Sequence, residues 1–338
     1  MRLWTQRGRG GKPLRVRLCA WLCLSIACGT GGAWAAVHVA DDPAAMEEAP
    51  ESANEEIHYA FPTTLDNVGR ILAPVTINGR GPFRFVLDTG ANRSVLSPRV
   101  AESLQLAPSA MTSVEVHGVT GSAVLPAVEV AVLQAGGRTL AKNKRMPVLP
   151  GPVLADADGI LGNEGLLGSR IEVDFRAGTV VISRSRGIPA EPGTLIVPLT
   201  LRHRGLLVAN ARVGRVRVKA IIDTGAERTL GNLALREALG IGPSDGPRGA
   251  LVTIHGATAI LAPGTSVVAP TIYLGDTELE HLEVTFGDLH VFRLWGLERQ
   301  PALLIGMDLL GTVHRLVIDY RRRELQIEPR AKASATGS

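Results

Sequence analysis

Short apolar runs rich in Val, Ile and Leu alternate with Gly, Pro and Asn along most of the chain, from about residue 61 to 182 and again from about 195 onward. Runs of this length, bounded by turn residues, are typical of β-strands. Two stretches favour short helices, Ser97 to Leu106 and Asn232 to Leu239. The first opens with Ser-Pro, which suits an N-cap followed by proline in the first turn. The pattern predicts an all-β protein.

The β-rich stretches define two units, 61–183 and 195–329, joined by a polar linker at 184–194 that contains Gly and Pro. Each unit has about 130 residues, which is within the usual range for a domain with its own core. A small, polar tail at 330–338 is expected to be disordered.

The N-terminal region has the pattern of a secretory signal. Residues 1–17 are basic without an acidic residue, an apolar run follows from Leu18 to Ala27, and Ala33-Trp34-Ala35 forms an A-x-A site. This order predicts a signal peptide at 1–35 that is cut after Ala35. The apolar run is shorter than the roughly 20 residues that a membrane-spanning helix needs. We therefore expect an exported, periplasmic protein, although an uncleaved anchor remains open.

Removal of the signal changes the charge argument. The formal net charge of +4 includes six signal cations, so the mature chain carries −2. The basic balance of the whole chain is then no argument for nucleic-acid binding. All three cysteines lie in the signal, which excludes disulfides and cysteine catalysis in the mature protein: Cys19, Cys23 and Cys28.

The segment at 36–60 is acidic and poor in apolar residues, with seven acids and no Lys or Arg. Such a segment cannot bury enough surface to order itself, which predicts a disordered tether. The remaining body has 30 cations against 25 acids, so an autoinhibitory arm is the alternative.

The chain contains one apolar stretch ending in Asp-Thr-Gly-Ala twice, at 86–91 and 221–226. A single copy is most simply a turn, because Asp and Gly are ordinary turn residues. The surroundings also repeat, in the same order: 70–97 with 205–232, 114–120 with 252–258, and 158–175 with 302–320. Matched segments in one order indicate an internal duplication.

This set of motifs resembles the retropepsin-like aspartic protease family, in a bacterial form with both halves in one chain. The resemblance covers most of 65–328. It implies two homologous β-barrel lobes with a cleft between them. It also implies that Asp88 and Asp223, 135 residues apart, form the catalytic pair.

The expected chemistry requires two carboxylates. Two such groups about 3 Å apart cannot both ionise, so they share a proton and act as base and acid on a water and a carbonyl. Gly90 and Gly225 are expected to allow tight turns and close approach of the two loops. The resemblance implies that Thr89 and Thr224 hydrogen-bond across to the opposite loop.

Ala91 and Ala226 stand where pepsin-like enzymes have a hydroxyl that would lower the pKa of the pair. Their presence predicts a mildly acidic to neutral optimum.

The hairpins at 115–122 and 253–259 are candidate flaps over an extended substrate. Their glycines are expected to make them flexible, and the candidate substrate contacts are His117, Gly118, His255 and Gly256. The alternative is that both histidines occupy ordinary hairpin positions and do not contact substrate. The histidine spacing fits no metal motif, so no metal or cofactor is implied.

Three further features bear on the site. Asp158 precedes Gly159 and is expected to be structural. Asn163 and Met307 stand where retroviral members have a bracing Arg, so the bracing must differ. The stretch 286–300 is longer than its lobe 1 counterpart, and its Trp295 either lines a specificity pocket or anchors the core.

The predicted function is an aspartic endopeptidase acting on polypeptide as a monomer, without nucleic-acid partners. An actin-like phosphate loop is excluded because long alternating helices are missing from the pattern. A periplasmic peptide receptor built on the protease fold is the alternative. The paired Asp residues argue against it, because a receptor has no use for a strained like-charge pair.

Overall fold

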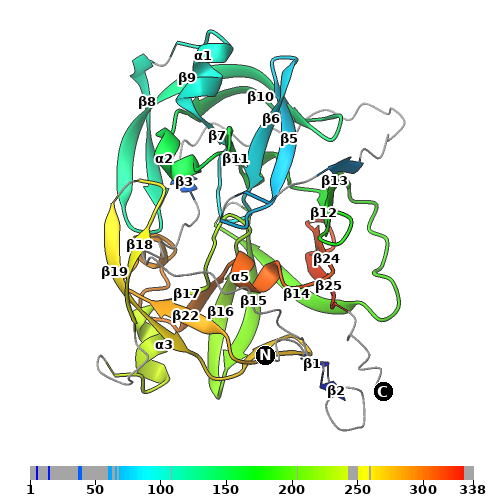
Figure 1. The fold of residues 1–338 in the computed structure, drawn as a ribbon, viewed down its shortest axis with the longest axis vertical. Coiled ribbons are helices and arrows are strands. Elements are labelled where there is room, and N and C mark those ends of the chain that lie inside the picture. The colour runs from blue at the N-terminus through cyan, green and yellow to red at the C-terminus, as the bar shows by residue number, and fades with distance from the viewer. Residues whose placement is uncertain are drawn as a thin grey trace, which may run out of the picture.

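The computed structural model describes residues 60–62, 65–66, 68–107, 109–203, 205–242, 250–258 and 260–330, and three short strands before them: β1 (Thr5–Gln6), β2 (Leu14–Arg15) and β3 (Val37–Val39). Most of the expected signal and acidic segment, and residues 331–338 of the tail, lie outside the described residues. Figure 1 shows two β-rich lobes, the first above the second. The all-β prediction is confirmed.

Lobe 1 is built on one sheet in the order β3-β8-β9-β5-β6-β11-β7, with β10 beside β9. The turn between β5 and β6 is Asn78-Gly79, both with positive φ, which is the preferred chemistry of a two-residue hairpin. Its strands are β5 (Leu72–Ile77), β6 (Arg80–Leu87), β7 (Val95–Leu96), β8 (Ser109–Gly118), β9 (Ser122–Ala135), β10 (Arg138–Pro147) and β11 (Gly159–Leu161).

Lobe 2 repeats this arrangement. In both lobes the strand that leads to Asp-Thr-Gly pairs in parallel with the strand that ends in the later Gly: β6 with β11 and β16 with β23. The lobe 2 strands are β15 (Leu206–Val213), β16 (Val216–Ile222), β17 (Leu230–Gly231), β18 (Ala250–His255), β19 (Leu261–Val268), β20 (Ile272–Leu274), β21 (Thr277–Leu279), β22 (Glu283–Phe286) and β23 (Ala302–Ile305).

An antiparallel sheet shared by the two lobes joins them, in the order β4-β13-β12-β24-β25-β14. Residues 185–194 between the units contain no helix or strand. The shared strands are β4 (Ala60–Pro62), β12 (Ser169–Asp174), β13 (Thr179–Arg184), β14 (Leu195–Arg202), β24 (Arg315–Asp319) and β25 (Glu324–Glu328).

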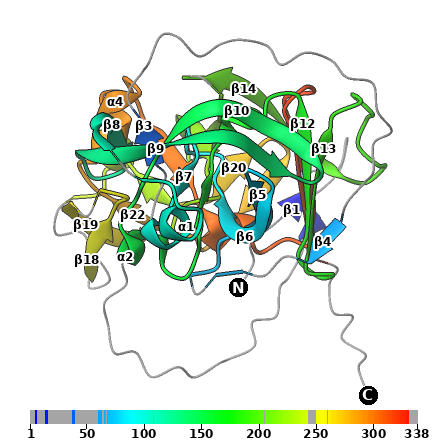
Figure 2. The ribbon, with the colours of Figure 1, turned by 90° about the horizontal axis from the view of Figure 1, so that it is seen from above.

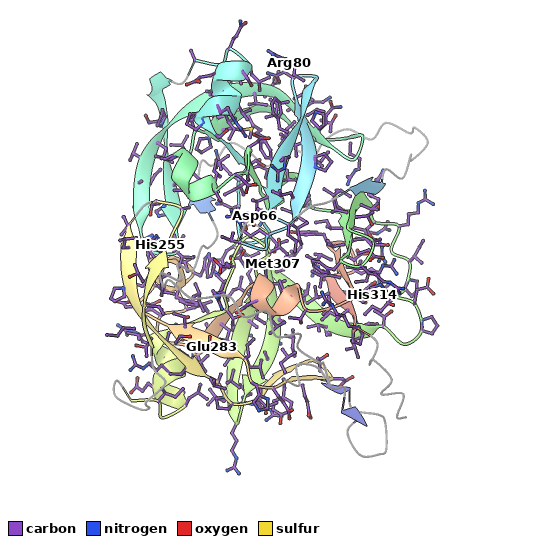
Figure 3. The ribbon with its side chains drawn as sticks, viewed as in Figure 1. Asp66, Arg80, His255, Glu283, Met307 and His314 are labelled. Atoms are coloured by element: carbon purple, nitrogen blue, oxygen red, sulfur yellow. The ribbon has the colours of Figure 1, made fainter. Side chains whose placement is uncertain are left out.

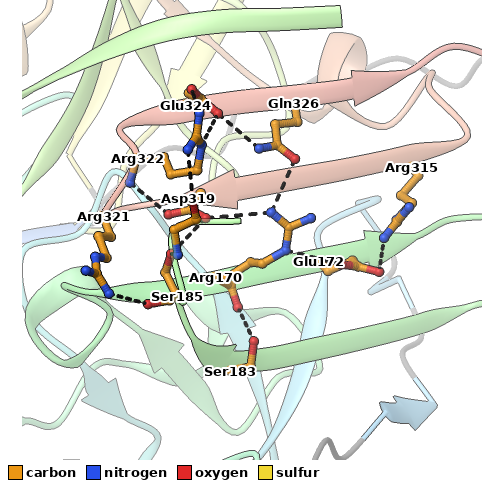
Figure 4. Close-up of polar contacts among 11 residues, drawn as sticks. Arg170, Glu172, Ser183, Ser185, Arg315, Asp319, Arg321, Arg322, Glu324 and Gln326 are labelled. Atoms are coloured by element: carbon orange, nitrogen blue, oxygen red, sulfur yellow. Dashed lines mark hydrogen bonds and ion pairs between the residues drawn. The ribbon is translucent and has the colours of Figure 1, made fainter. Parts of the chain in front are cut away.

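A polar network crosses this shared sheet (Figure 4). Arg170 of β12 lies 3.6 Å from buried Asp319 of β24 and 3.2 Å from the amide oxygen of Gln326 on β25. The hydroxyl of Ser185 donates to the same Asp319 at 2.8 Å. Because breaking one partner would leave a buried charge without compensation, the network fixes how the lobes meet.

Both predicted helices are present. In α1 (Pro98–Ser103) the Ser97 side chain caps the helix by accepting from Val100 N, and in α3 (Leu233–Ala238) Asn232 does the same with Leu235 N. The structure adds short helices that the pattern did not predict: α2 (Gly151–Leu154), the 3₁₀ turn η1 (Asn163–Gly165), α4 (His290–Leu294) and α5 (Met307–Leu310). Among the described residues, no helix has the length and apolar character required to cross a membrane.

Two hairpins, β8–β9 and β18–β19, extend toward each other on one side of the molecule (Figure 1). The tip of each hairpin packs against the other lobe. Val119 of the first hairpin is buried in an apolar cluster of lobe 2, and Ala257 of the second is buried in one of lobe 1. We call the hairpins flap 1 and flap 2.

The N-terminal strands give two further pairings. Strand β1 pairs with β2 and with β21 of lobe 2. Strand β3 lies inside the segment expected to have no structure of its own, yet it pairs with β8 in the register Val37 to Gly118. Backbone pairing to an open strand edge explains how so short an acidic segment finds a partner.

Candidate active site

Two aspartates meet at the boundary of the lobes, each at the end of a buried strand. Asp88 follows β6, and its N–H donates to Leu161 O at 3.0 Å; Asp223 follows β16, and its N–H donates to Ile305 O at 3.0 Å. Their exposed fractions are 1% and 0%. The parallel strand pair of each lobe therefore aims one carboxylate at the other lobe.

Each carboxylate is fixed by its own loop. Oδ1 of Asp88 accepts from the backbone N–H groups of Gly90 and Ala91, both at 2.8 Å. Oδ1 of Asp223 accepts from Gly225 and Ala226 at 2.9 and 3.1 Å. Oδ2 of Asp223 is buried without a hydrogen-bond partner among the described residues.

The two loops touch closely. A Cβ placed on Gly225 would lie 2.2 Å from Cγ of Asp88. Any side chain at Gly225 would therefore displace the carboxylate of the other lobe.

Burial controls the ionisation of the pair. Burial raises the pKa of Asp88 to about 6, while the N–H groups of Ala91 and Gly90 act in the opposite direction. Burial, and after it the charge of Asp88, raises the pKa of Asp223 well above its usual range. Two such groups hold a common proton at mildly acidic pH, and that proton belongs to the pair.

Two threonines connect the loops. The Thr89 hydroxyl donates to Ile222 O at 2.7 Å and accepts from Thr224 N at 3.2 Å. The Thr224 hydroxyl donates to Leu87 O at 2.6 Å and accepts from Thr89 N at 3.1 Å. The expected hydrogen bonds across to the opposite loop are present, and they satisfy four buried backbone groups at the lobe boundary.

The family model described as aspartyl protease matches the chain twice, over residues 73–169 and 209–309, which together make up more than half of it. The first match contains Asp88 and the second Asp223. The chain belongs to the aspartyl protease family. No curated protein matches it.

In this aspartyl protease a second pair of side chains supports each loop, and sequence reasoning missed it. Ser94 N donates to Oε1 of Glu164 at 3.0 Å, and the Ser94 hydroxyl accepts from Gly162 N at 3.1 Å. In lobe 2, Thr229 N donates to Oδ2 of Asp308 at 2.9 Å, and the Thr229 hydroxyl accepts from Gly306 N at 3.2 Å.

A signal for this support was available in the repeat. Both lobes carry a hydroxyl residue six positions after the Asp and an acid two positions after the later Gly. The bracing question raised by Asn163 and Met307 is answered by the backbone as well: their N–H groups donate to Ala91 O and Ala226 O at 2.9 and 2.8 Å. Figure 3 shows Met307 on α5 in the middle of the molecule.

A buried cation also lies near the pair. Arg70 is 3% exposed, its side chain lies 2.6 Å from Asp66, and its guanidinium also donates to Leu154 O at 3.3 Å. Its charge is one of the smaller influences that lower the pKa of Asp88. The pattern of the sequence gave no indication of this residue.

The flap residues lie at the contact between the flaps. A Cβ on Gly118 would be 3.0 Å from Ala257 N, and one on Gly256 would be 2.2 Å from the hydroxyl oxygen of Thr120. That hydroxyl donates to Ile260 O at 2.6 Å. The structure thus gives these glycines a packing reason that the expectation of flexibility did not include.

The two flap histidines have different surroundings. His117 on β8 contacts His290 of lobe 2, with Nδ1 3.1 Å from Nε2. His255 ends β18 (Figure 3). Among the described residues, no three or more His, Cys, Asp or Glu side chains lie close enough together to hold a metal ion.

Two alternatives are decided by packing. Asp158 accepts from Arg84 N at 2.8 Å and from Arg99, so it is structural as expected. Trp295 is 3% exposed and packs edge to face on Phe292, with ring centroids 6.1 Å apart. It is a core anchor.

Proposed function

We propose that this protein is an aspartic endopeptidase that hydrolyses peptide bonds in extended polypeptide segments, with water activated between Asp88 and Asp223. The observation that carries the proposal is the buried pair itself, one carboxylate from each lobe, held by matched hydrogen bonds. Paired groups with strongly raised pKa values at a lobe boundary are typical of acid–base sites.

The reaction follows from the shared proton. The ionised carboxylate takes a proton from water as the water oxygen bonds to the carbonyl carbon, and the protonated carboxyl gives its proton to the carbonyl oxygen. When the C–N bond breaks, the leaving nitrogen receives a proton from the pair, and the carbonyl re-forms. No covalent intermediate is needed. The unpartnered Oδ2 of Asp223 supports a role in holding the water.

An extended substrate suits the flaps. The outer edge of β8 already accepts an extended segment, since Val37–Val39 pairs there with Val116–Gly118. A polypeptide that binds in this way gains backbone hydrogen bonds, and its side chains alternate between two faces.

A mildly acidic to neutral optimum is proposed. The pKa of about 6 at Asp88, raised by burial, places the singly protonated pair in this range. Ala91 and Ala226 are fully buried and offer no hydroxyl that would stabilise the charged form. An activity maximum below about pH 3, near the values of pepsin, would contradict this.

The test is cleavage of an unfolded protein mixture from pH 3.5 to 7.5, read by mass spectrometry, with wild type, Asp88→Asn and Asp223→Asn. We expect cleavage by wild type and its loss in both variants. Asp276→Asn, at an exposed turn of lobe 2, is the matched control and is expected to cleave normally. Cleavage that survives either substitution in the pair would overturn the proposal.

One observation favours a second function, a peptide receptor. The two carboxylate residues are 1% and 0% exposed while the flap tips are in contact, so the described form presents little carboxylate surface to a substrate. If folded wild type binds unfolded polypeptide but cleaves nothing at any pH, with and without residues 36–60, the receptor function is the better account.

We also propose that the protein is exported to the periplasm, on the basis of the basic and apolar N-terminal sequence. The mass of the mature N-terminus tests this. A first residue of Ala36 is expected, and a retained Met1 would contradict signal cleavage.

A further inference from the structure

Helix α4 of lobe 2 reaches flap 1 of lobe 1. It lies in the stretch 286–300, for which lobe 1 has only the shorter α2, and Figure 2 shows it beside β8. Val291 N donates to Val119 O at 3.2 Å. The Val119 side chain is fully buried in the cluster that contains Phe292 and Trp295. Flap 1 is therefore docked on lobe 2 through both backbone and side chain.

A pair of histidines stands at the edge of this contact. His117 of flap 1 and His290, the first residue of α4, stack with ring centroids 5.3 Å apart and an angle of 18° between the rings. Nδ1 of His117 lies 3.1 Å from Nε2 of His290. At that distance one ring must donate and the other accept, which is possible while the pair carries at most one proton beyond its neutral form. When both rings are protonated, all four nitrogens are donors and the rings carry like charges.

The charged groups around the pair come from several elements. On β8, Oε2 of Glu115 lies 3.9 Å from Nε2 of His117. On α4, Arg293 adds positive charge and is itself paired with Asp288. On β3, the backbone of His38 is the register partner of His117.

These groups resist the second proton. Burial lowers the pKa of His290, the charges of His117 and Arg293 lower it further, and Glu115 acts in the opposite direction. A folded-state value below the ordinary one means that the contact is intact above about pH 6.5 and is lost as the pH falls through the lowered value.

We propose that His290 is a positioning residue that holds flap 1 closed over the aspartate pair, and that double protonation of His117 and His290 releases the flap. This inference rests on the proposed function, since it regulates access to the same site. The aspartates are 1% and 0% exposed while the flap tips touch, so opening of flap 1 would increase access to them.

The device acts on one flap only. At flap 2 the equivalent of Val119 is Ala257, and the lobe 1 helix at the corresponding place, α2, has the sequence Gly-Pro-Val-Leu without an imidazole. The histidine contact that responds to acid therefore belongs to flap 1.

The experiment is amide hydrogen exchange over residues 115–122 at pH 7 and pH 5, corrected for the intrinsic rates, with wild type, His290→Gln and His290→Ala. Gln places a hydrogen-bonding group near the position of Nε2 but cannot be protonated. For wild type we expect flap 1 to open about fivefold more often at pH 5 than at pH 7. This ratio corresponds to the net free energy of one neutral hydrogen bond. His290→Gln should stay protected at both values, and His290→Ala should open readily at both. His314→Gln, an imidazole near the shared sheet and away from the flaps (Figure 3), is the matched control and should behave as wild type.

Equal protection of wild type at both pH values, or the same acid response in His290→Gln as in wild type, would overturn the inference. If His290→Ala does not fold, the comparison of wild type with His290→Gln still decides. KM for a peptide substrate should fall on acidification in wild type and not in His290→Gln, with kcat less affected, because a larger fraction of the enzyme is open to substrate.

Exchange needs no turnover, so the two proposals fail separately. A pH-dependent flap without cleavage would contradict the endopeptidase alone. An active enzyme in which the opening of flap 1 does not change with pH would contradict the histidine mechanism alone.

Discussion

The two lobes are nearly identical at their aspartates and unlike at their flaps. Each aspartate loop has the same two N–H donors, the same threonine bridge and the same hydroxyl and acid behind it. The flaps differ because flap 1 places Val119 in the lobe 2 cluster and pairs His117 with His290, whereas flap 2 places the smaller Ala257 in the lobe 1 cluster. Symmetry is kept where two groups must share one proton, and it is absent where the molecule covers its site. The difference implies that closure is controlled mainly from one side.

The largest expected effect comes from disturbing the close approach of the loops. Gly225→Ala would place a Cβ 2.2 Å from Cγ of Asp88 and move that carboxylate. We expect the cleavage rate to fall by about a hundredfold or more, because a misplacement near 1 Å costs that much. Steady-state cleavage of a peptide by folded variant protein measures it. Turnover within a few fold of wild type would show that the loops are not packed as described.

The threonine bridge tests whether the symmetric part is symmetric in energy. Thr89→Val and Thr224→Val each remove two buried hydrogen bonds and leave two backbone groups unpaired. Each should lower the free energy of unfolding by about 2–4 kcal/mol, measured by urea denaturation. Thr→Ser at the same positions keeps the hydroxyl and is the control. A large loss of unfolding free energy in one variant and none in the other would show that the two halves of the threonine bridge are not equivalent.

Ionisation of the aspartates should cost stability. Because the folded-state pKa of Asp88 is about 6 against an ordinary value of 3.8, the folded form is favoured at low pH and loses stability as pH rises through that interval. Asp88→Asn removes the cost. Its unfolding free energy should exceed that of wild type by up to about 3 kcal/mol at pH 7 and match it near pH 4. Equal stabilities at pH 7 would argue against a strained pair.

The smallest effect sharpens the flap comparison. Val119→Ala makes flap 1 resemble flap 2 at this position, with loss of buried methyl groups from the lobe 2 cluster. We expect a loss of about 1–2 kcal/mol in urea denaturation and faster amide exchange in flap 1. Ala257→Gly in flap 2 should cost less in apolar burial, since only one methyl is removed. A larger effect at Ala257 would mean that flap 2 is the better anchored.

Most of the features that the sequence predicted are ones that repeat, although the hydroxyl and acid behind each aspartate loop also repeat and were missed. The Asp-Thr-Gly loops, the flap hairpins, the capped helices and the structural Asp158 follow from local patterns that occur twice or from standard turn and cap chemistry. The threonine bridge followed from the family resemblance, because nothing in local spacing shows which loop a hydroxyl faces.

The features without a repeat could not be predicted. His117 and His290 are 173 residues apart, and no pattern links a flap strand to a helix of five residues in the other lobe. Arg70 with Asp66 is likewise unmarked in sequence. The packing role of the flap glycines could not be predicted either, because the space around a residue is a property of tertiary structure. Trp295 needed its neighbours to decide between pocket and core.

The most direct measurement of the account is a pH titration of the aspartate side-chain carboxyl carbons by ¹³C NMR, in wild type and in Asp88→Asn. One carboxyl is expected to titrate far above the usual range in wild type, and its midpoint should fall when Asp88 is replaced, because the neighbouring charge has been removed. If no carboxyl titrates above the usual range, or if the substitution leaves its midpoint unchanged, the two lobes do not form one proton-sharing pair.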